Sequence, residues 1–296
     1  MADAFEQIPE VVIDYVRRVF ADANDKVTRT MSVHPSMHEE SLDHVLIMEL
    51  SATPPAFFAA ERAAVSLESH WLGGRHMYHR WEIADIAFVV IMRRAGHLET
   101  RKVALLQTKR LYSEEIAVAP VDSFDYAIGI GRLVDRTDPQ LPLTVQRRFR
   151  FNDQSVYGAL TTGSDQVGRI NEYEQESGIP VYYGLYNPLT VPFEADYPAS
   201  GGLVAADSNT VGMRVLSARS VHTSLTSLSA GNVPTFDGLA VSQGWRIEAF
   251  VADEVLRCRE GRRFDAVDDV RLGNLLYRRT APIAAAITLT IDVGSA

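Results

Sequence analysis

Three short segments in the first third of the chain carry polar residues that suit one kind of chemistry. Glu39 and Glu40 are adjacent, Asp85 interrupts a long apolar run, and Gln107 and Lys109 end another. Mg²⁺ takes hard oxygen ligands in proteins, usually one or two carboxylates completed by water and substrate phosphate. A lysine beside such an ion can position a water or offset charge that develops on a phosphate. These residue types meet the needs of a metal-dependent phosphodiesterase.

A β-hairpin would bring the second and third segments together. Its parts are a buried strand, a turn and a return strand, over Ile83–Met92, Ala95–His97 and Lys102–Lys109. Side chains alternate along a strand, so Gln107 and Lys109 share one face, and Asp85 in the facing strand reaches the same cation as Gln107. A buried aspartate facing a buried lysine also occurs as a purely structural ion pair, and that alternative stays open here.

The acidic pair stands at the start of a predicted helix, His38–Leu50. Glu39 shares a stripe with Leu42 and Leu46, whereas Glu40 falls on a neighbouring stripe. An active site beside the core needs a carboxylate that faces inward. Glu39 is therefore the favoured residue of the pair, and Glu40 remains the alternative.

The order of these features resembles the PD-(D/E)xK nuclease superfamily. An acidic pair on a helix comes first, Asp85 follows, and about twenty residues of hairpin separate it from Gln107-x-Lys109. Gln107 stands where the second acidic residue usually lies. This variant is similar to the QxK branch, which includes Mrr-like restriction enzymes and the double-stranded DNA endonuclease domains of some anti-phage effectors. The resemblance covers residues 38–110 and extends less closely to residues 166–169 and 181–187.

The resemblance implies an endonuclease that uses Mg²⁺ or Mn²⁺ to cleave DNA phosphodiester bonds, with RNA as an open alternative. Asp85 would be the central metal ligand, and Gln107 would contribute its side-chain carbonyl oxygen. Lys109 would orient the attacking water or stabilise the transition state. Glu39 would be a direct or outer metal ligand, with Glu40 as the alternative. Because Gln107 is neutral, we expect a weaker metal site than an acidic residue would make.

Four further residues are candidate contacts to nucleic acid. Arg75 and Arg80 precede the predicted hairpin, where guanidinium groups would meet phosphate. Gln166 and Arg169 lie on a predicted helix, Asp165–Ser177, which by the resemblance flanks the active site. Ordinary polar surface is the competing interpretation for all four.

Composition limits the class of protein. The chain has 296 residues, 46 % of them hydrophobic and 23 % charged, with a formal net charge of −9. This acidic balance argues against a polybasic nucleic-acid binder but leaves room for a nuclease whose carboxylates hold cations. No apolar run approaches the roughly 20 residues of a membrane-spanning helix. The chain has one cysteine and no sign of a signal peptide at its start, so a cytoplasmic protein with no membrane partner is expected.

The whole chain predicts a single α/β domain over residues 1–296. We expect a restriction-endonuclease-like mixed sheet core flanked by helices, about residues 30–190, and a C-terminal extension, about residues 191–296. The other expected elements are helices over Pro9–Ala23, Phe57–Leu67 and Trp245–Arg259, a turn at Asn24–Asp25, a strand over Val181–Tyr186, a long loop over Pro192–Asn209, and a final β-rich segment over Ile283–Val293.

Partners follow from the expected activity. Cutting both strands of a duplex needs two active sites, so a homo-oligomer or a partner encoded by a neighbouring gene is expected. Two hypotheses for the function result. The first is a bacterial restriction or anti-phage defence effector that cleaves DNA. The second is a catalytically inactive subunit that keeps the nuclease fold for binding or scaffolding in a defence complex.

Overall fold

The helices and strands of the protein are seen in a computed structural model, which describes residues 4–71, 81–117, 147–197, 210–265, 269–276 and 282–294. The α-helices in these ranges are α1 (Glu10–Val33), α2 (Glu39–Ser51), α4 (Asp165–Ser177), α5 (Ala218–Thr226), α6 (Ile247–Ala249) and α7 (Val270–Leu276). A π-helix, η4 (Phe250–Val255), continues α6, and the short 3-10 helices are η1 (Phe5–Gln7) and η3 (Val241–Gln243). None of these described helices combines the length and apolar composition that a membrane crossing requires.

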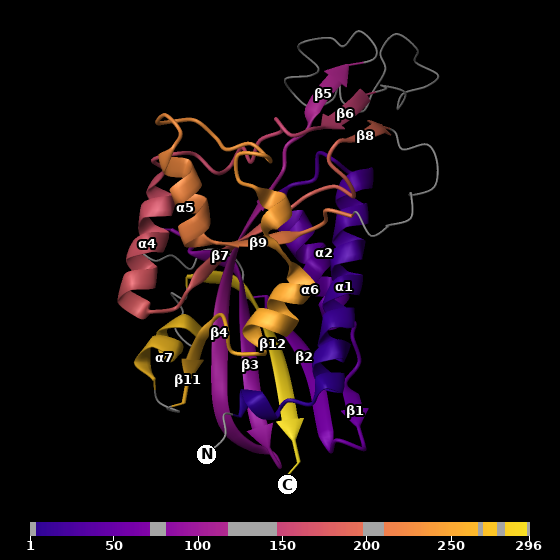
Figure 1. The fold of residues 1–296 in the computed structure, drawn as a ribbon, viewed down its shortest axis with the longest axis vertical. Coiled ribbons are helices and arrows are strands. Elements are labelled where there is room, and N and C mark those ends of the chain that lie inside the picture. The colour runs from indigo at the N-terminus through magenta and orange to yellow at the C-terminus, as the bar shows by residue number, and fades with distance from the viewer. Residues whose placement is uncertain are drawn as a thin grey trace.

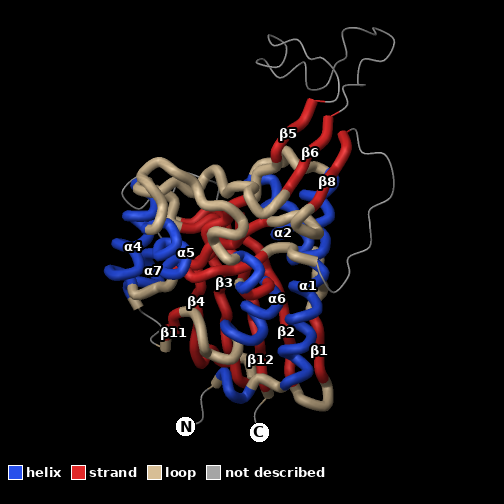
Figure 2. The backbone as a smooth tube through the Cα atoms, turned by 45° about the horizontal axis from the view of Figure 1, so that its top comes forward, coloured by secondary structure: helices blue, strands red, loops and turns tan. Residues whose placement is uncertain are grey.

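The strands of the same ranges form two sheets. The large sheet contains β1 (Ala56–Phe58), β2 (Ala63–Trp71), β3 (Ala84–Arg94), β4 (His97–Arg110), β7 (Val181–Tyr186), β9 (Arg214–Ser217), β10 (Trp245–Arg246), β11 (Arg262–Phe264) and β12 (Ile283–Val293). Its order is β1-β2-β12-β3-β4-β7-β9-β10, and β11 pairs with β4. The small sheet, β5 (Glu114–Ala117), β6 (Arg147–Phe151) and β8 (Phe193–Tyr197), projects from one end of the molecule (Figures 1 and 2).

This arrangement is a mixed α/β fold with a mainly mixed sheet flanked by helices, as expected. Helix α1 runs along one side of the large sheet next to α2, and helices α4, α5 and α7 lie at the other side (Figure 1). The apolar stripe of α1 recurs every three or four residues, and its members are all buried: Val12, Val16, Phe20, Ala23, Val27 and Met31. This stripe supplies the core beneath the sheet.

The predicted hairpin is confirmed, and it fixes one edge of the sheet. β3 pairs antiparallel with β4, and Ile86 lies opposite Leu106. Ala95 and Gly96 join the strands with φ of 48° and 81°, the positive values that a tight two-residue turn requires. β4 then pairs in parallel with β7. The start of β3 and the ends of β4 and β7 therefore meet at the same end of these inner strands, which is the edge of the sheet that runs across the strands.

The last strand lies in the middle of the large sheet rather than beside it. β12 pairs antiparallel with β2 along one side and parallel with β3 along the other. Most of its side chains are buried, as is typical of a strand covered on both faces. β9, β10 and β11 also belong to this sheet. A boundary near residue 190 therefore does not divide the sheet into a core and an extension.

The turn expected at Asn24–Asp25 is wrong, because α1 continues through it to Val33. Asn24 is buried, and its side chain bonds two distant segments as well as Thr28, one turn further along the helix. Its Nδ2 donates to Glu248 at 2.9 Å, and its Oδ1 accepts from the backbone of Met213 at 2.8 Å. A polar side chain that looked like a turn signal instead joins the first helix to two C-terminal segments.

The helix expected over Phe57–Leu67 is also wrong. The segment forms β1 and most of β2, which pair antiparallel with Ala56 opposite Val65. Ala63 and Val65 are buried two residues apart, which is the period of a strand. A short apolar run does not distinguish the period of a helix from that of a strand. Pairing with β12 makes this segment a strand.

The long helix expected over Trp245–Arg259 forms only in part. Its first two residues pair with β9 as β10, and the helical turns of α6 and η4 then end at Val255. Cys258 and Gly261 follow with positive φ, but Leu256 is the residue that caps the helical turns, so the expected closure at Gly261 is wrong. The expected loop over Pro192–Asn209 contains β8, and its residues 198–209 lie outside the described part of the chain.

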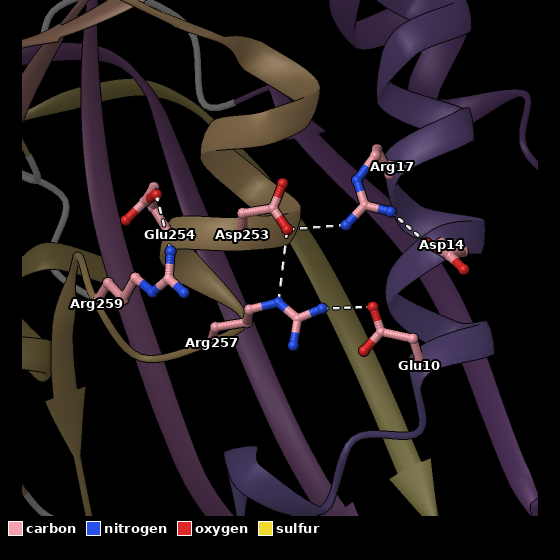
Figure 3. A network of polar contacts seen from close by, with 7 residues as sticks. All are labelled: Glu10, Asp14, Arg17, Asp253, Glu254, Arg257 and Arg259. Atoms are coloured by element: carbon pink, nitrogen blue, oxygen red, sulfur yellow. Dashed lines mark hydrogen bonds and ion pairs between the residues drawn. The ribbon is translucent and has the colours of Figure 1, made fainter.

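Charged side chains join this C-terminal helical segment to α1 (Figure 3). Arg17 pairs with Asp253 at 2.8 Å and also with Asp14, and Arg257 pairs with both Asp253 and Glu10. All are partly exposed, so each pair contributes little to stability. Most of the attachment comes from apolar side chains of η4 that are buried: Phe250, Val251 and Val255.

We expect Ile287→Asp to unfold the protein although it lies in the last strand. Ile287 is 1 % exposed, and a carboxylate there would be buried without a partner, which costs more than about 4 kcal/mol. Val270→Asp, at a side chain that is 68 % exposed, should change stability by less than about 0.5 kcal/mol. Urea unfolding followed by circular dichroism measures both. Similar small losses for the two variants would show that β12 is dispensable to the core.

Candidate active site

The three segments singled out in the sequence meet at one edge of the large sheet. Asp85 is the second residue of β3, and Glu39 is the first residue of α2. Gln107 and Lys109 lie close to the C-terminal end of β4. Antiparallel pairing places the start of β3 beside the end of β4. Helix α2 packs against β4, which brings its first turn to the same edge.

The Asp85 carboxylate is held by three donors from β4. Its Oδ2 accepts from Gln107 Nε2 at 2.5 Å, from the backbone N–H of Thr108 at 2.6 Å, and from Thr108 Oγ1 at 2.9 Å. Its Oδ1 accepts from no residue in the described part of the chain. Burial raises the pKa of Asp85, and the charge of Lys109 and the donors of Thr108 oppose that rise. One carboxylate oxygen is therefore fixed and the other is open.

Gln107 turns its amide nitrogen, not its carbonyl oxygen, toward Asp85. The carbonyl Oε1 instead accepts from Gln166 Nε2 at 3.3 Å. Gln166 stands in the first turn of α4 and also donates to the backbone carbonyl of Glu82 at 3.4 Å. A half-turn of the Gln107 amide would exchange its two ends and direct Oε1 to the Asp85 side. A role for Gln107 as a metal ligand requires that rotation.

Asp43 on α2 belongs to this group, although the sequence did not single it out as a site residue. Its side chain is 3 % exposed; one of its oxygens accepts from Tyr186 Oη at 2.7 Å, and the other lies within hydrogen-bond distance of Thr108 Oγ1, at 2.9 Å. Its pKa lies well above the ordinary value, first because of burial and second because of the nearby Asp85 charge. Asp43 follows Glu39 by four residues, and this helical spacing was the available signal.

Thr108 links the two aspartates through a single hydroxyl. Its Oγ1 lies 2.9 Å from Asp43 and 2.9 Å from Asp85, but it has only one proton to donate. Both contacts are hydrogen bonds when Asp43 carries a proton, donates it to Thr108, and Thr108 donates to Asp85. The raised pKa of Asp43 fits this assignment. The arrangement leaves the net negative charge on Asp85.

Lys109 is the positive charge of the site, and it is buried without a direct partner. It is 7 % exposed, and its ammonium makes no hydrogen bond or ion pair with any described residue. Its charge nevertheless lowers the pKa values of Asp43, Glu82 and Asp85, so it lies among these carboxylates. The purely structural Asp–Lys contact that the sequence left open is therefore not formed in the described part of the chain.

The two glutamates at the start of α2 act on different carboxyl groups. Glu39 is half-buried, its Oε1 is enclosed with no donor, and its charge raises the pKa of Asp85. Glu40 is exposed, and its charge acts on Glu82, a half-buried carboxyl that the sequence reasoning missed. Burial, with Asp85 and Glu40 nearby, raises the pKa of Glu82 to about 7. An acidic residue just before a buried strand was the signal for Glu82.

Of the four candidate contacts to nucleic acid, one touches a residue of the site in the described part of the chain. Gln166 reaches the site through Gln107. Arg169 pairs with Glu172 on its own helix at 2.5 Å and makes no described contact with the site residues. The predicted helix that carries both is confirmed as α4, and Gly178 ends it with φ of 67°. Arg75 and Arg80 lie outside the described residues.

The donor set fits a cation such as Mg²⁺ or Mn²⁺. Asp85 Oδ1 and Glu39 Oε1 are carboxylate oxygens that no described residue donates to, and Glu39 Oε1 is also enclosed, which is costly without a partner. No three histidine, cysteine or acidic side chains among the described residues form a ready metal-binding group. Mg²⁺ commonly takes only one or two carboxylates and keeps several waters. These residues fit that open kind of site.

We expect Glu82→Gln to change how stability depends on pH. The pKa of Glu82 is raised from 4.5 to about 7 on folding, so the protonated form stabilises the protein below about pH 4.5, and this contribution is lost as pH rises through about 7. Glutamine mimics the protonated form at every pH. The stability of the variant relative to wild type should therefore rise between pH 4.5 and 7 and then level off.

Urea unfolding in EDTA from pH 4 to 8 measures this difference, with Glu49→Gln at an exposed position of α2 as the matched control. A relative stability that stays flat for Glu82→Gln, or that changes equally for Glu49→Gln, would contradict the raised pKa.

The chain was compared with models of protein families, with curated proteins and with solved structures, and none of the three comparisons found a match. A function for the site therefore has to come from its own residues. Those residues bring together the open oxygen of Asp85, the enclosed Oε1 of Glu39 and the buried ammonium of Lys109.

Proposed function

We propose that the protein is a metal-dependent nuclease that hydrolyses phosphodiester bonds at this sheet edge. The observation that carries the proposal is the buried ammonium of Lys109, which stands among carboxylates without touching any described acceptor. A buried charge normally has a direct partner. An ammonium whose charge acts on Asp85, and a carboxylate oxygen of Asp85 that no described residue donates to, suit a cation, a water and a phosphate that together complete their contacts.

Each residue has a distinct task in this proposal. Asp85 and Glu39 hold the cation, and Gln107 adds its carbonyl oxygen once its amide has rotated. A bound Mg²⁺ ion lowers the pKa of a coordinated water and offsets charge on phosphoryl oxygens. Lys109 orients the attacking water or stabilises the negative charge that develops on the phosphate.

Two supporting residues hold Asp85 in place for this chemistry. Thr108 fixes one oxygen of the Asp85 carboxylate with its backbone N–H and hydroxyl, so the other oxygen keeps a constant direction. Asp43 in turn holds the Thr108 hydroxyl and is itself held by Tyr186. Pre-organised ligands of this kind cost no rearrangement when a cation binds.

The choice of DNA over RNA, and the place in bacterial restriction or anti-phage defence, are supported by the sequence resemblance alone. Cleavage of both strands would bring two copies of the site together, so we propose a homodimer or a partner protein. An inactive scaffold is the second candidate function. The observation that favours it is the amide of Gln107, which donates to one oxygen of Asp85 without any cation.

We expect plasmid DNA to be cleaved with Mg²⁺ or Mn²⁺, and Asp85→Asn and Lys109→Met each to reduce the rate by more than about a hundredfold. The reasons are loss of the charged ligand in the first variant and loss of the positive charge in the second. Asp253→Asn, in the ion pairs that join α1 and η4 far along the chain, is the matched control and should cleave at the wild-type rate.

Calorimetric titration with Mn²⁺ separates the two candidate functions. A heat signal that Asp85→Asn abolishes supports the metal site. Cleavage that is equal in wild type and both site variants would remove the nuclease assignment, and absence of both cleavage and Mn²⁺ binding would leave the scaffold.

We expect Gln107→Glu to strengthen metal binding and to destabilise the metal-free protein. The added carboxylate would lie beside Asp85, so the two charges repel each other in EDTA and the hydrogen bond from Nε2 is lost. A divalent cation relieves the repulsion, so Mn²⁺ should bind about tenfold more tightly than to wild type. Melting temperatures in EDTA and in Mn²⁺ measure both effects. A variant whose melting temperature shifts by the same amount as wild type on adding Mn²⁺ would show that residue 107 does not face the cation.

A further inference from the structure

Arg110, the last residue of β4, is a buried cation that makes no ion pair with any described residue. It is 6 % exposed, and its Nη1 donates to two backbone carbonyls, those of Pro35 and Met37, at 2.7 Å each. The guanidinium carbon lies 4.0 Å from the centre of the Tyr112 ring. Stacking and two carbonyl acceptors thus replace the carboxylate that a buried arginine usually has.

The two carbonyls belong to the short segment that leads into α2. His38 follows as the residue that caps the helix, but its side chain makes no capping hydrogen bond. Glu39 and Glu40 then form the first turn of α2. No side-chain cap therefore holds the start of α2 in place. The hydrogen bonds from Arg110 instead tie the segment before the helix to β4.

Strand β4 therefore carries both the candidate catalytic residue Lys109 and Arg110, which holds the segment before Glu39. Lys109 and Arg110 are neighbours in β4, and side chains alternate along a strand, so they leave it on opposite faces. Lys109 lies among the carboxylates, and Arg110 reaches the segment before Glu39. A displacement of that segment would move Glu39 relative to Asp85.

We propose that Arg110 is a positioning residue for the metal site, because it fixes residues 35–37 and so the place where α2 presents Glu39. This inference rests on the proposed metal-dependent function. Arg110 touches neither the cation nor the substrate. It acts through Glu39, so its loss should weaken metal binding while the chemistry at saturating metal persists.

Arg110→Met and Arg110→Lys test this role, with Arg214→Met as the matched control. Arg214 on β9 also donates to two backbone carbonyls, those of Val211 at 2.8 Å and Gly244 at 3.2 Å, so its loss costs similar hydrogen bonds away from the site. Hydrogen exchange of the peptide covering residues 34–43 reports the segment directly, in EDTA. Calorimetry with Mn²⁺ and cleavage rates across a Mn²⁺ series report the metal site.

We expect Arg110→Met to speed exchange in residues 34–43 and to weaken Mn²⁺ binding by about tenfold or more, a loss typical of residues that support metal ligands. At saturating Mn²⁺ its cleavage rate should return to within about threefold of wild type. Arg110→Lys should recover part of the affinity because an ammonium can still donate to the carbonyls. Arg214→Met should leave both the exchange of residues 34–43 and the Mn²⁺ affinity unchanged.

Three results would overturn the positioning role. The first is unchanged exchange in Arg110→Met, and the second is faster exchange with wild-type Mn²⁺ affinity. The third is an equal loss of affinity in Arg214→Met, because the effect would then be one of general stability. A wild-type protein that binds no Mn²⁺ overturns the proposed function itself, and it is recognised before any variant is made.

Discussion

The antiparallel pairing of β3 with β4 is the constraint on which the candidate site depends. It sets Ile86 opposite Leu106, so the next residues outward are Asp85 and Gln107. A slip of one residue in this register would send Asp85 to the other face and separate it from both Gln107 and Thr108. Apolar side chains on both strands hold the register, because a slip would also bring polar side chains into the core. The chemistry of the site thus rests on packing that takes no part in it.

The site concentrates negative charge where folding alone would avoid it. Asp43, Glu82 and Asp85 all have raised pKa values, and loss of solvation is the first cause for each. A carboxyl group whose pKa rises on folding destabilises the folded state at neutral pH. The cluster therefore costs stability, which the packing of the surrounding sheet, with β12 paired to both β2 and β3, has to offset. Perturbed carboxyls gathered at one sheet edge are typical of functional sites.

The sequence predicted what depends on neighbours in the chain and missed what depends on distant ones. The hairpin, α2 and α4 follow from local periodicity and turn residues; the bounds of α2 and α4 agree closely with the structure, whereas β4 begins at His97, earlier than the expected Lys102. Asn24 looked like a turn because its partners, Met213 and Glu248, lie far away in sequence. The last strand was recognised as a strand, but no local pattern states that it enters the sheet between β2 and β3. Asp43 falls within the predicted helix, but only Tyr186 and Thr108 reveal it as part of the site.

The electrostatics of the site bear on the choice between an enzyme and a scaffold. A scaffold that kept only the fold would keep all its described hydrogen bonds if Lys109 were replaced by an apolar residue of similar length, although Asp43, Glu82 and Asp85 would lose the charge that lowers their pKa values. Gln107 and Thr108 together already satisfy one oxygen of Asp85. Three groups of the proposed metal site have no direct partner among the described residues: the Lys109 ammonium, Oδ1 of Asp85 and the enclosed Oε1 of Glu39, and the enclosed Oε1 of Glu82 nearby also lacks one. One cation, with a water and a phosphate, would give all three a partner, which favours catalysis over a purely structural role.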